Sequence, residues 1–590
     1  MIQWYIYIKP PSVYLPHSVK MLCLLVLLGA AATATAQTAG SRVVTTHHGP
    51  IRGFKLPDGS IYGFFDVPYA TVPTGRDKFK APLPPPTWTQ PFDAVPRGII
   101  CPQLNILVTV PHIMQEDCLV ANIFVPDTND TNLPVVVNVH GGGFVLGSGS
   151  SLQYTNFVRN NNMILITFNY RLGAYGFLCL GTENAPGNAG MKDQAALLRW
   201  VNQNIAQFGG NPNDVTVMGC SAGGISTDLL TISNMTRNLF HRAIPESGCS
   251  YGPIAIQYDP IQNARDYARL LNYTNIDSME DLEEFYLTVP AETLATRLIS
   301  TITHLDSSLT FTACLERDVG VEMFLQDDPA DILKNGDFPA MPLLYGLAKE
   351  EGMFRIPNIL TGWLSKMNEH FSDFLPHELE FESVQEKERV ANTVRTFYFG
   401  NRPIGISTIP EYVDYHTDVL FGYRMMKGLT LRLEAKDQPI YLYQYSFVDE
   451  NTQPMWFTNA TGANHCEQAS IMSDHDTTGK TEAYINMQNM TRSLWTNFIL
   501  TGKPVPDGSS LPTWPATNIT RSPYMDLGPV VRLENSMFGA RFELWDGIYE
   551  KHYRKPMRPN PNMPGSAAGV ASNVYVLSLV VCSLASRYFY

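Results

Sequence analysis

Short apolar segments rich in β-branched residues recur along the chain, and longer segments with helical spacing separate them. Three of the apolar segments are LPVVVNV at 133–139, MILITFNY at 163–170 and VTVMG at 215–219. Two more follow, MPLLYG at 341–346 and IYLYQYSF at 440–447. Apolar strands that alternate with helices are typical of a mostly parallel sheet covered by helices on both faces. The pattern therefore predicts an α/β fold.

A glycine-rich turn follows the strand predicted at 215–219. Its residues are Gly219-Cys220-Ser221-Ala222-Gly223, and the pattern after them is helical. A G-x-S-x-G turn between a strand and a helix exposes the serine oxygen above the sheet, because the glycines let the chains pass closely. The turn makes Ser221 a candidate nucleophile, and a structural glycine turn is the alternative.

A second glycine run follows the strand predicted at 133–139, as His140-Gly141-Gly142-Gly143. An acyl-transfer serine needs amide donors that point at the developing oxyanion, and glycines at a strand end leave such donors unobstructed. The expected donors are the backbone N–H groups of Gly142, Gly143 and Ala222. The presence of both glycine turns in this order favours acyl-transfer chemistry over a purely structural turn.

Candidates for the acid and the base follow the serine along the chain. When a G-x-S-x-G serine has partners of this kind, their order is nucleophile, acid and then histidine. Glu350 and Glu351 follow the strand at 341–346, and His465 follows the strand at 440–447. Spacing alone leaves both glutamates open, and a solvated acidic loop and a surface histidine are the structural alternatives.

Composition and charge narrow the range of functions. The chain has 590 residues, of which 44% are hydrophobic, and its formal net charge is -13. An acidic chain without a cluster of Lys and Arg is not expected to bind nucleic acid. No cluster of His, Cys and carboxylate residues in the sequence suggests a metal site. We therefore expect no metal and no organic cofactor.

Both ends of the chain carry predicted processing signals. Residues 1–36 contain an apolar run followed by a small-residue cleavage site, as in a secretory signal peptide. A Pro/Gly/Ser-rich stalk is predicted over 554–573, with attachment of a glycosylphosphatidylinositol (GPI) anchor near 565–568. Residues 574–590 form a hydrophobic tail, and a frayed C-terminus is the alternative. The globular domain is predicted to span 37–553.

Six Asn-x-Ser/Thr sequons agree with passage through the secretory pathway. They begin at Asn129, Asn234, Asn272, Asn459, Asn489 and Asn518. One sequon is weak evidence, whereas six beside a signal peptide are consistent with one another. We therefore expect a glycoprotein that is secreted or anchored at the cell surface.

Six motifs follow one another along the chain. They are EDCLVANIFVP, HGGGF, NYRLGAYGFLCLG, the long segment from APGNAG to CSAGG, KEEGMF and GANHCEQ. Together they resemble the cholinesterase and type B carboxylesterase family, and the insect carboxylesterases most of all, over about residues 43–550. The resemblance implies a single α/β-hydrolase domain with Ser221 as nucleophile, Glu351 as acid and His465 as base. Glu351, and not Glu350, takes the family's position directly before the glycine.

The resemblance also implies a reaction, the hydrolysis of carboxylic esters through an acyl-enzyme on Ser221. The family includes adhesion proteins that lost the triad, so a catalytically weak adhesion or ligand-binding protein is the alternative. Cholinesterases hold a quaternary ammonium on a Trp in the first disulfide loop, and the corresponding loop here, 101–118, has no Trp. Choline esters are therefore not expected as preferred substrates. The physiological ester and the oligomeric state stay open.

Seven cysteines remain once the predicted signal peptide and tail are removed, so at least one is expected to stay unpaired. Cys101 and Cys118 match the family's first disulfide. Cys220 directly precedes the predicted nucleophile, and Cys466 directly follows the predicted base. Contact between nucleophile and base would bring these two cysteines within the range of a disulfide. We predict a Cys220–Cys466 bridge, and two buried thiols are the alternative.

The resemblance bears on two of the remaining cysteines, and the local sequence bears on the third. Cys249 and Cys314 fall near the acyl-binding side in related proteins, and we predict a bridge between them. Cys179 lies in the apolar segment GFLCLG and is expected to be a buried free thiol. The same resemblance implies that Leu309 and Phe311 shape the acyl side of the pocket.

Overall fold

The computed structural model describes residues 40–561, apart from residues 58, 105–111, 152–153, 296, 298–303, 456, 475 and 507. The predicted signal peptide, the attachment site near 565–568 and the hydrophobic tail lie outside the described residues. The start of the predicted stalk is described. Arg554 Nη2 lies 2.6 Å from Asp259 Oδ2, so this part of the segment lies against the globular domain.

The strands of the structure form one large sheet and one small one. The strands of the large sheet are β1 (Ser41–Thr46), β2 (Gly49–Lys55), β3 (Ile61–Pro68), β4 (Phe92–Asp93), β7 (Val120–Pro126), β8 (Leu133–Val139), β9 (Ile164–Phe168), β10 (Gly210–Cys220), β11 (Arg242–Glu246), β12 (Leu343–Ala348), β13 (Ile440–Tyr445), β14 (Tyr524–Leu527) and β15 (Arg532–Glu534). The small sheet pairs β5 (Ile99–Ile100) with β6 (Ile113–Met114).

The large sheet is mostly parallel, as predicted. Its strand order is β1-β2-β3-β7-β9-β8-β10-β11-β12-β13-β14-β15, and β4 pairs with β2. From β9 to β14 in this order the neighbours pair in parallel, while β1, β2, β3 and β7 add an antiparallel end. The carboxyl ends of the parallel strands therefore meet along one edge of the sheet, where ligands of such folds bind.

Helices cover the sheet and extend beyond it. The α-helices are α2 (Thr155–Asn161), α3 (Gly173–Phe177), α4 (Ala189–Asn204), α5 (Ala222–Ile232), α6 (Pro260–Leu270), α7 (Met279–Thr288), α8 (Ala291–Ala295), α9 (Pro329–Asn335), α10 (Trp363–Glu369), α11 (Val384–Phe399), α12 (Ile409–Thr417), α13 (Tyr423–Ala435), α14 (Glu467–Met472), α15 (Glu482–Thr501) and α16 (Gly539–His552). The 3₁₀ helices are η1 (Gly75–Asp77), η2 (Ile205–Phe208), η3 (Asn234–Thr236), η5 (Glu351–Thr361), η6 (Phe371–Phe374) and η7 (Ile406–Thr408). One π-helix, η8 (Asp418–Gly422), is also described.

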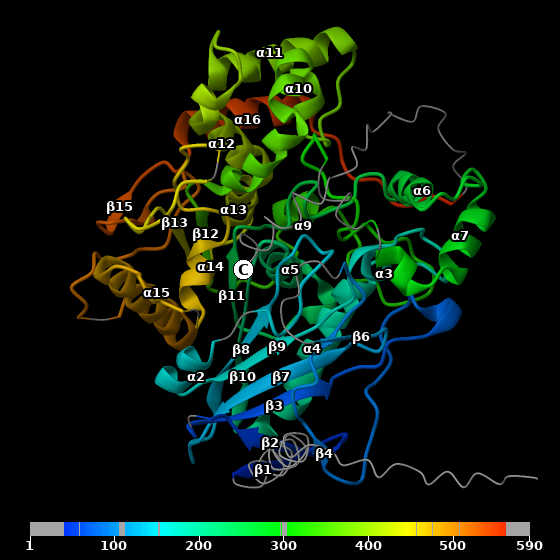
Figure 1. Cartoon of the computed structure of the whole chain (residues 1–590), viewed down its shortest axis with the longest axis vertical. Helices are drawn as coiled ribbons and strands as arrows, with labels where there is room; N and C mark the ends of the chain where they lie inside the picture. The colour runs from blue at the N-terminus through cyan, green and yellow to red at the C-terminus, as the bar shows by residue number, and fades with distance from the viewer. Residues whose placement is uncertain are drawn as a thin grey trace, which may run out of the picture.

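The two faces of the sheet pack into separate apolar cores, because successive side chains of a strand point to opposite faces. Val135 and Val137 of β8 belong to the core that includes α4 and α5, whereas Val136 belongs to the core that includes α15. Figure 1 shows α10, α11, α12 and α16 together at the top of the molecule, far from β1 and β2 at the bottom. The predicted helices on both faces are thus confirmed.

Three disulfides join described cysteines. The predicted Cys101–Cys118 and Cys220–Cys466 bridges are present, with Cα–Cα distances of 5.0 and 6.0 Å. The third bridge joins Cys179 to Cys314, with a Cα–Cα distance of 6.6 Å. The prediction that Cys314 pairs with Cys249 is therefore wrong, and so is the prediction that Cys179 is free.

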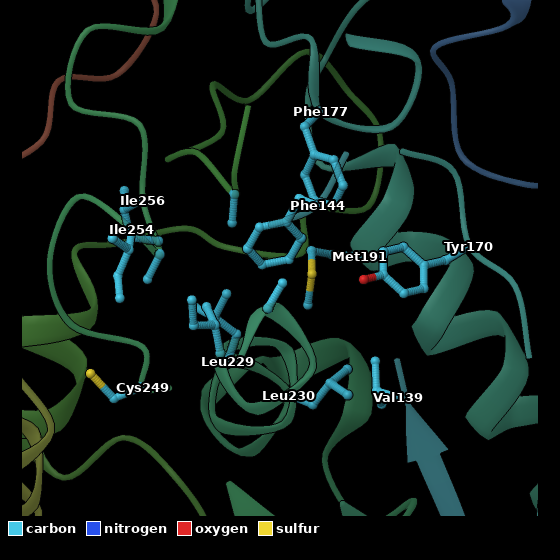
Figure 2. Packing of buried hydrophobic residues seen from close by; sticks show 14 of the residues in the cluster. Val139, Phe144, Tyr170, Phe177, Met191, Leu229, Leu230, Cys249, Ile254 and Ile256 are labelled. Atoms are coloured by element: carbon cyan, nitrogen blue, oxygen red, sulfur yellow. The ribbon is translucent and has the colours of Figure 1, made fainter. Parts of the chain in front are cut away.

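Asn188 explains the Cys179–Cys314 pairing. Its Oδ1 accepts the N–H of Cys314 at 2.8 Å, and its Nδ2 donates to the carbonyl of Cys314 at 2.9 Å. These bonds hold Cys314 against the segment that carries Cys179. Cys249 instead lies in the apolar core as a free thiol. Figure 2 shows it at the edge of the cluster around Leu229 of α5.

Buried ion pairs connect loops to this core. Arg171 and Asp193 are both fully buried, and two guanidinium nitrogens of Arg171 bind the two carboxylate oxygens of Asp193 at 2.8 and 2.6 Å. Arg171 Nη1 also donates to the carbonyls of Lys78 and Lys80. Removing one member of such a pair leaves the other as an uncompensated buried charge.

We expect Asp193→Ala to lower the free energy of unfolding by about 3–5 kcal/mol, because Arg171 loses its only close carboxylate among the described residues. Urea-induced unfolding followed by fluorescence measures the change. Glu322→Ala is the control, since Glu322 pairs with Arg199 at the surface, where an ion pair stabilises little. Equal effects of the two variants would contradict the importance of the buried pair.

Candidate active site

Ser221 occupies a sharp turn between β10 and α5. Its backbone angles are φ 61° and ψ -128°, which few residues other than glycine adopt. A Cβ on Gly219 would lie 2.6 Å from the carbonyl oxygen of Val139, and one on Gly223 would lie 2.1 Å from the same atom. The two glycines therefore let the turn pass directly over the end of β8 and lift the side chain of Ser221 above the sheet.

The glycine run after β8 lies beside this turn. A Cβ on Gly141 would meet the carbonyl oxygen of Cys220 at 2.7 Å and Ser221 Cβ at 3.2 Å. Gly142 and Gly143 have φ of 109° and 60°, so both use conformations that favour glycine. Among the hydrogen bonds of the described residues, none uses the N–H of Gly142, Gly143 or Ala222. Three backbone donors are thus available next to Ser221.

Glu351 and His465 form a buried pair at the same edge of the sheet. Glu351 is fully buried, and its Oε2 accepts a hydrogen bond from His465 Nδ1. This bond fixes the imidazole with Nδ1 as the donor and leaves Nε2 facing other groups. The structure thus brings the predicted acid and base together.

Glu350, the other glutamate of the sequence pattern, has a different contact. Its Oε2 accepts the N–H of Ala463 at 2.9 Å, and its own N–H donates to the carbonyl of Ala463 at 3.1 Å. Glu350 therefore holds the loop that carries His465, whereas Glu351 binds the imidazole itself.

Two aromatic rings hold His465 from the sides. Phe421 stacks on the imidazole with a centroid distance of 4.6 Å and an interplanar angle of 20°, and Phe354 lies 5.2 Å away. His465 Nε2 lies 3.8 Å from Cys466 Sγ. The described hydrogen bonds include none between Ser221 and His465, although both line one cavity. Such contacts are often long in the absence of substrate.

Sequence reasoning missed Ser247 and Gln468. Ser247 Oγ donates to Glu351 Oε1, and the N–H of Ala348 donates to the same oxygen at 2.8 Å. Gln468 Nε2 donates to Ser247 Oγ at 2.8 Å. The only signal in the sequence is that Ser247 follows the strand β11, which ends at the same edge of the sheet. These donors hold the Glu351 carboxylate in place.

Glu246 is a buried carboxyl group beside the candidate nucleophile. The N–H of Ser221 donates to the Glu246 carbonyl at 3.0 Å, and Tyr443 Oη donates to Glu246 Oε1 at 3.0 Å. Burial raises the pKa of the Glu246 carboxyl to about 8. Glu246 is therefore mostly uncharged at neutral pH.

A cavity of about 160 Å³ joins these groups. Its walls come from the end of β8 and the glycine run, from the turn at Ser221, and from the loop and helix after His465. The residues that line it include Gly142, Cys220, Ser221, Glu246, His465 and Cys466. The cavity brings the candidate nucleophile and base into one space that a small molecule can enter.

The remaining predicted residues lie elsewhere. All six sequon asparagines have exposed side chains. Phe311 is buried against Tyr267, with a centroid distance of 4.9 Å, and neither Leu309 nor Phe311 lines the described cavity.

The described residues contain no group of three or more His, Cys, Asp or Glu side chains that could hold a metal ion. No described helix is long and apolar enough to cross a membrane.

A strained serine turn, a buried Glu–His pair and a glycine loop with free amides, all at the carboxyl edge of a parallel sheet, define an α/β-hydrolase of the serine type. A model of the carboxylesterase family matches residues 40–545. The chain belongs to this family, and it is a carboxylic ester hydrolase.

Known proteins are similar over most of the chain. Juvenile hormone esterase of Heliothis virescens is 32% identical over 550 residues, which cover 88% of this chain and 96% of that protein. Esterase FE4 of Myzus persicae is 28% identical over 500 residues, covering 81% and 87%. The crystal structure of juvenile hormone esterase from Manduca sexta, with OTFP covalently attached, has a TM-score of 0.76 and 29% identity, covering 86% of this chain and all of that one.

The shifted pKa of Glu246 predicts a pH-dependent stability. The folded protein keeps this carboxyl protonated up to about pH 8, whereas an unfolded chain loses the proton near the ordinary pKa of 4.5. The stability linked to this proton is complete below pH 4.5 and is lost as the pH rises toward 8.

We therefore expect Glu246→Gln, which cannot ionise, to gain stability relative to the wild type as the pH rises from 5 to 8. The difference in free energy of unfolding should change by up to about 1.4 kcal/mol per pH unit. Urea unfolding of both proteins at several pH values measures it. Parallel stability curves would contradict a protonated Glu246 in the folded state.

Proposed function

We propose that the protein hydrolyses carboxylic esters through an acyl-enzyme on Ser221, with His465 as base and Glu351 as acid. The observation that supports this most is the buried Glu351–His465 bond at the cavity that also contains Ser221. His465 takes the proton of Ser221 Oγ as the oxygen attacks the ester carbonyl. Glu351 orients the imidazole and stabilises its charged form.

The backbone N–H groups of Gly142, Gly143 and Ala222 would bind the oxyanion of the tetrahedral intermediate. Each such donor contributes on the order of 10² to 10³ in rate. The alcohol then leaves with the proton from His465, and water repeats the sequence to release the acid. No step of this cycle needs a group other than the residues of the chain and water.

We propose uncharged esters as the substrate class. The loop closed by the Cys101–Cys118 bridge has no Trp that would hold a quaternary ammonium through a cation–π contact. Relatives named juvenile hormone esterase make a juvenile hormone ester the first natural substrate to test.

We also propose a secreted glycoprotein with a GPI anchor as its attachment to the membrane. The apolar N-terminal run, the six exposed sequon asparagines and the order of small, polar and apolar residues after 565–568 support this location. The disulfides among the described cysteines also favour an oxidising compartment.

We expect Ser221→Ala to abolish ester turnover and to leave the fold intact, because the variant lacks only the attacking oxygen. Stopped-flow hydrolysis of p-nitrophenyl acetate measures the burst of nitrophenol that an acyl-enzyme produces. A phosphonate that reacts with activated serine should remove the burst of the wild type and add its mass to Ser221.

Ser470→Ala is the matched control, since Ser470 is a second serine that lines the same cavity. It should keep activity of the same order as the wild type. If folded wild type gives neither burst nor adduct, the adhesion or ligand-binding alternative is the better description of the protein.

Glycosylation has its own test. Peptide-N-glycosidase F should lower the mass of the secreted protein and convert the asparagines that carried glycans to aspartates in the peptide map. We expect conversion within the sequons from Asn129 to Asn518, because all six side chains are exposed. An unchanged mass would contradict the proposed glycosylation.

A further inference from the structure

The Cys220–Cys466 disulfide lies inside the candidate active site. Cys220 precedes Ser221 and Cys466 follows His465, and both cysteines line the cavity and are only half-buried. A thiol that enters the cavity can therefore reach this disulfide. Cysteines of the other two disulfides are at most 1% exposed. Of the three disulfides between described cysteines, the structure thus makes this one selectively accessible.

Each sulfur of this bridge lies beside a nitrogen of the site. Gln468 Nε2 donates toward Cys220 Sγ at 3.8 Å. His465 Nε2 lies at the same distance from Cys466 Sγ. A hydrogen-bond donor or a protonated imidazole next to a sulfur stabilises its thiolate, and a stable thiolate is a good leaving group in exchange.

We propose that Cys220–Cys466 is a site of reversible thiol–disulfide exchange that silences the esterase when it is reduced, because the freed Cys466 thiolate pairs with His465. The inference rests on the proposed role of His465 as the base. It concerns a modification of the active site itself, with a dithiol as the class of reductant.

The exchange needs no reactant other than the protein disulfide and the dithiol. A thiolate of the dithiol attacks Cys466 Sγ, the bond between the sulfurs breaks, and Cys220 leaves as a thiolate. The second thiol of the reductant then attacks the mixed disulfide and releases Cys466 as a thiolate. The dithiol is oxidised to a disulfide by two electrons, and the protein gains two thiol groups.

After reduction, the thiolate of Cys466 lies next to the imidazole of His465, the proposed base. An imidazolium–thiolate pair forms readily between a cysteine and a neighbouring histidine. A protonated His465 held by Cys466 cannot accept the proton of Ser221, although its Nδ1 keeps the bond to Glu351. Burial raises the pKa of the carboxyls of Glu246, to about 8, and of Glu467, so burial disfavours the negative charge of both groups in the cavity.

The first test measures how readily the Cys466 thiol ionises, and it does not depend on ester turnover. In full-length Cys220→Ala, Cys466 is unpaired, and alkylation by iodoacetamide is followed from pH 5 to 9 with the adduct mapped by mass spectrometry. We expect the rate to be half-maximal well below the ordinary thiol pKa of about 8.5. His465→Gln in the same background should return it toward that value.

Cys249 is the internal control for this test, because burial raises the pKa of its thiol to about 12 and should prevent its alkylation over this range. An ordinary thiol pKa for Cys466 in Cys220→Ala, or no effect of His465→Gln, would overturn the proposed pairing.

The second test measures the p-nitrophenyl acetate burst. Dithiothreitol should reduce only Cys220–Cys466 and lower the turnover of the wild type by about 100-fold, the range expected for loss of a general base, and reoxidation should restore it. Cys220→Ala should be slow without reductant. Cys220→Ala/Cys466→Ala should be faster than the single variant and should not respond to reductant.

The outcomes separate the two proposals. Absence of a burst in oxidised wild type would contradict the esterase mechanism, while the alkylation result still decides whether Cys466 pairs with His465. If mass spectrometry shows that the bridge is reduced and the burst is nevertheless unchanged, the proposed switch is overturned. Equal loss of ester turnover in the single and double variants would overturn the proposed pairing of Cys466 with His465. In that case the bridge would only hold the two segments together.

Discussion

The close passage of the Ser221 turn over the end of β8 is the constraint on which the rest of the site depends. Only glycine at positions 219 and 223 lets the turn approach the carbonyl of Val139. This approach gives Ser221 its left-handed backbone and starts α5 at Ala222, directly after the turn. A side chain at either glycine would move Ser221 and Ala222 together.

The parallel sheet supplies the second requirement, which is to gather residues that are distant in the sequence. Ser221, Glu351 and His465 each follow the carboxyl end of a parallel strand, and those ends share one edge. For this reason the sequence could predict the fold, and it could name candidate site residues that the structure brings to one edge of the sheet. Buried parallel strands are continuous apolar segments, and β8 was predicted with the bounds the structure has. The antiparallel strands β1 to β3 gave no such signal, since their apolar residues are interrupted by polar ones.

The cysteines show where prediction from the sequence ends. Cys220 and Cys466 are neighbours of residues that the proposed chemistry brings together, so their contact followed from that chemistry. Cys314 had no comparable neighbour, and its partner was decided by Asn188, whose side chain binds both backbone groups of Cys314. The sequence did not predict Ser247 and Gln468 for the same reason. The polar groups that hydrogen-bond a buried carboxylate are set by three-dimensional contacts and not by spacing along the chain.

His465 is held by more contacts than positioning requires. Glu351 binds its Nδ1, Phe421 stacks on its ring, and Glu350 holds the backbone of its loop through Ala463. A covalent tether next to the histidine therefore adds little to its orientation, and the bridge has a chemical consequence that the other contacts lack. It keeps a thiol, which can give its proton to the imidazole and pair with it as a thiolate, from forming 3.8 Å from the base. In this view the bridge protects the imidazole from a competing partner more than it fixes its position.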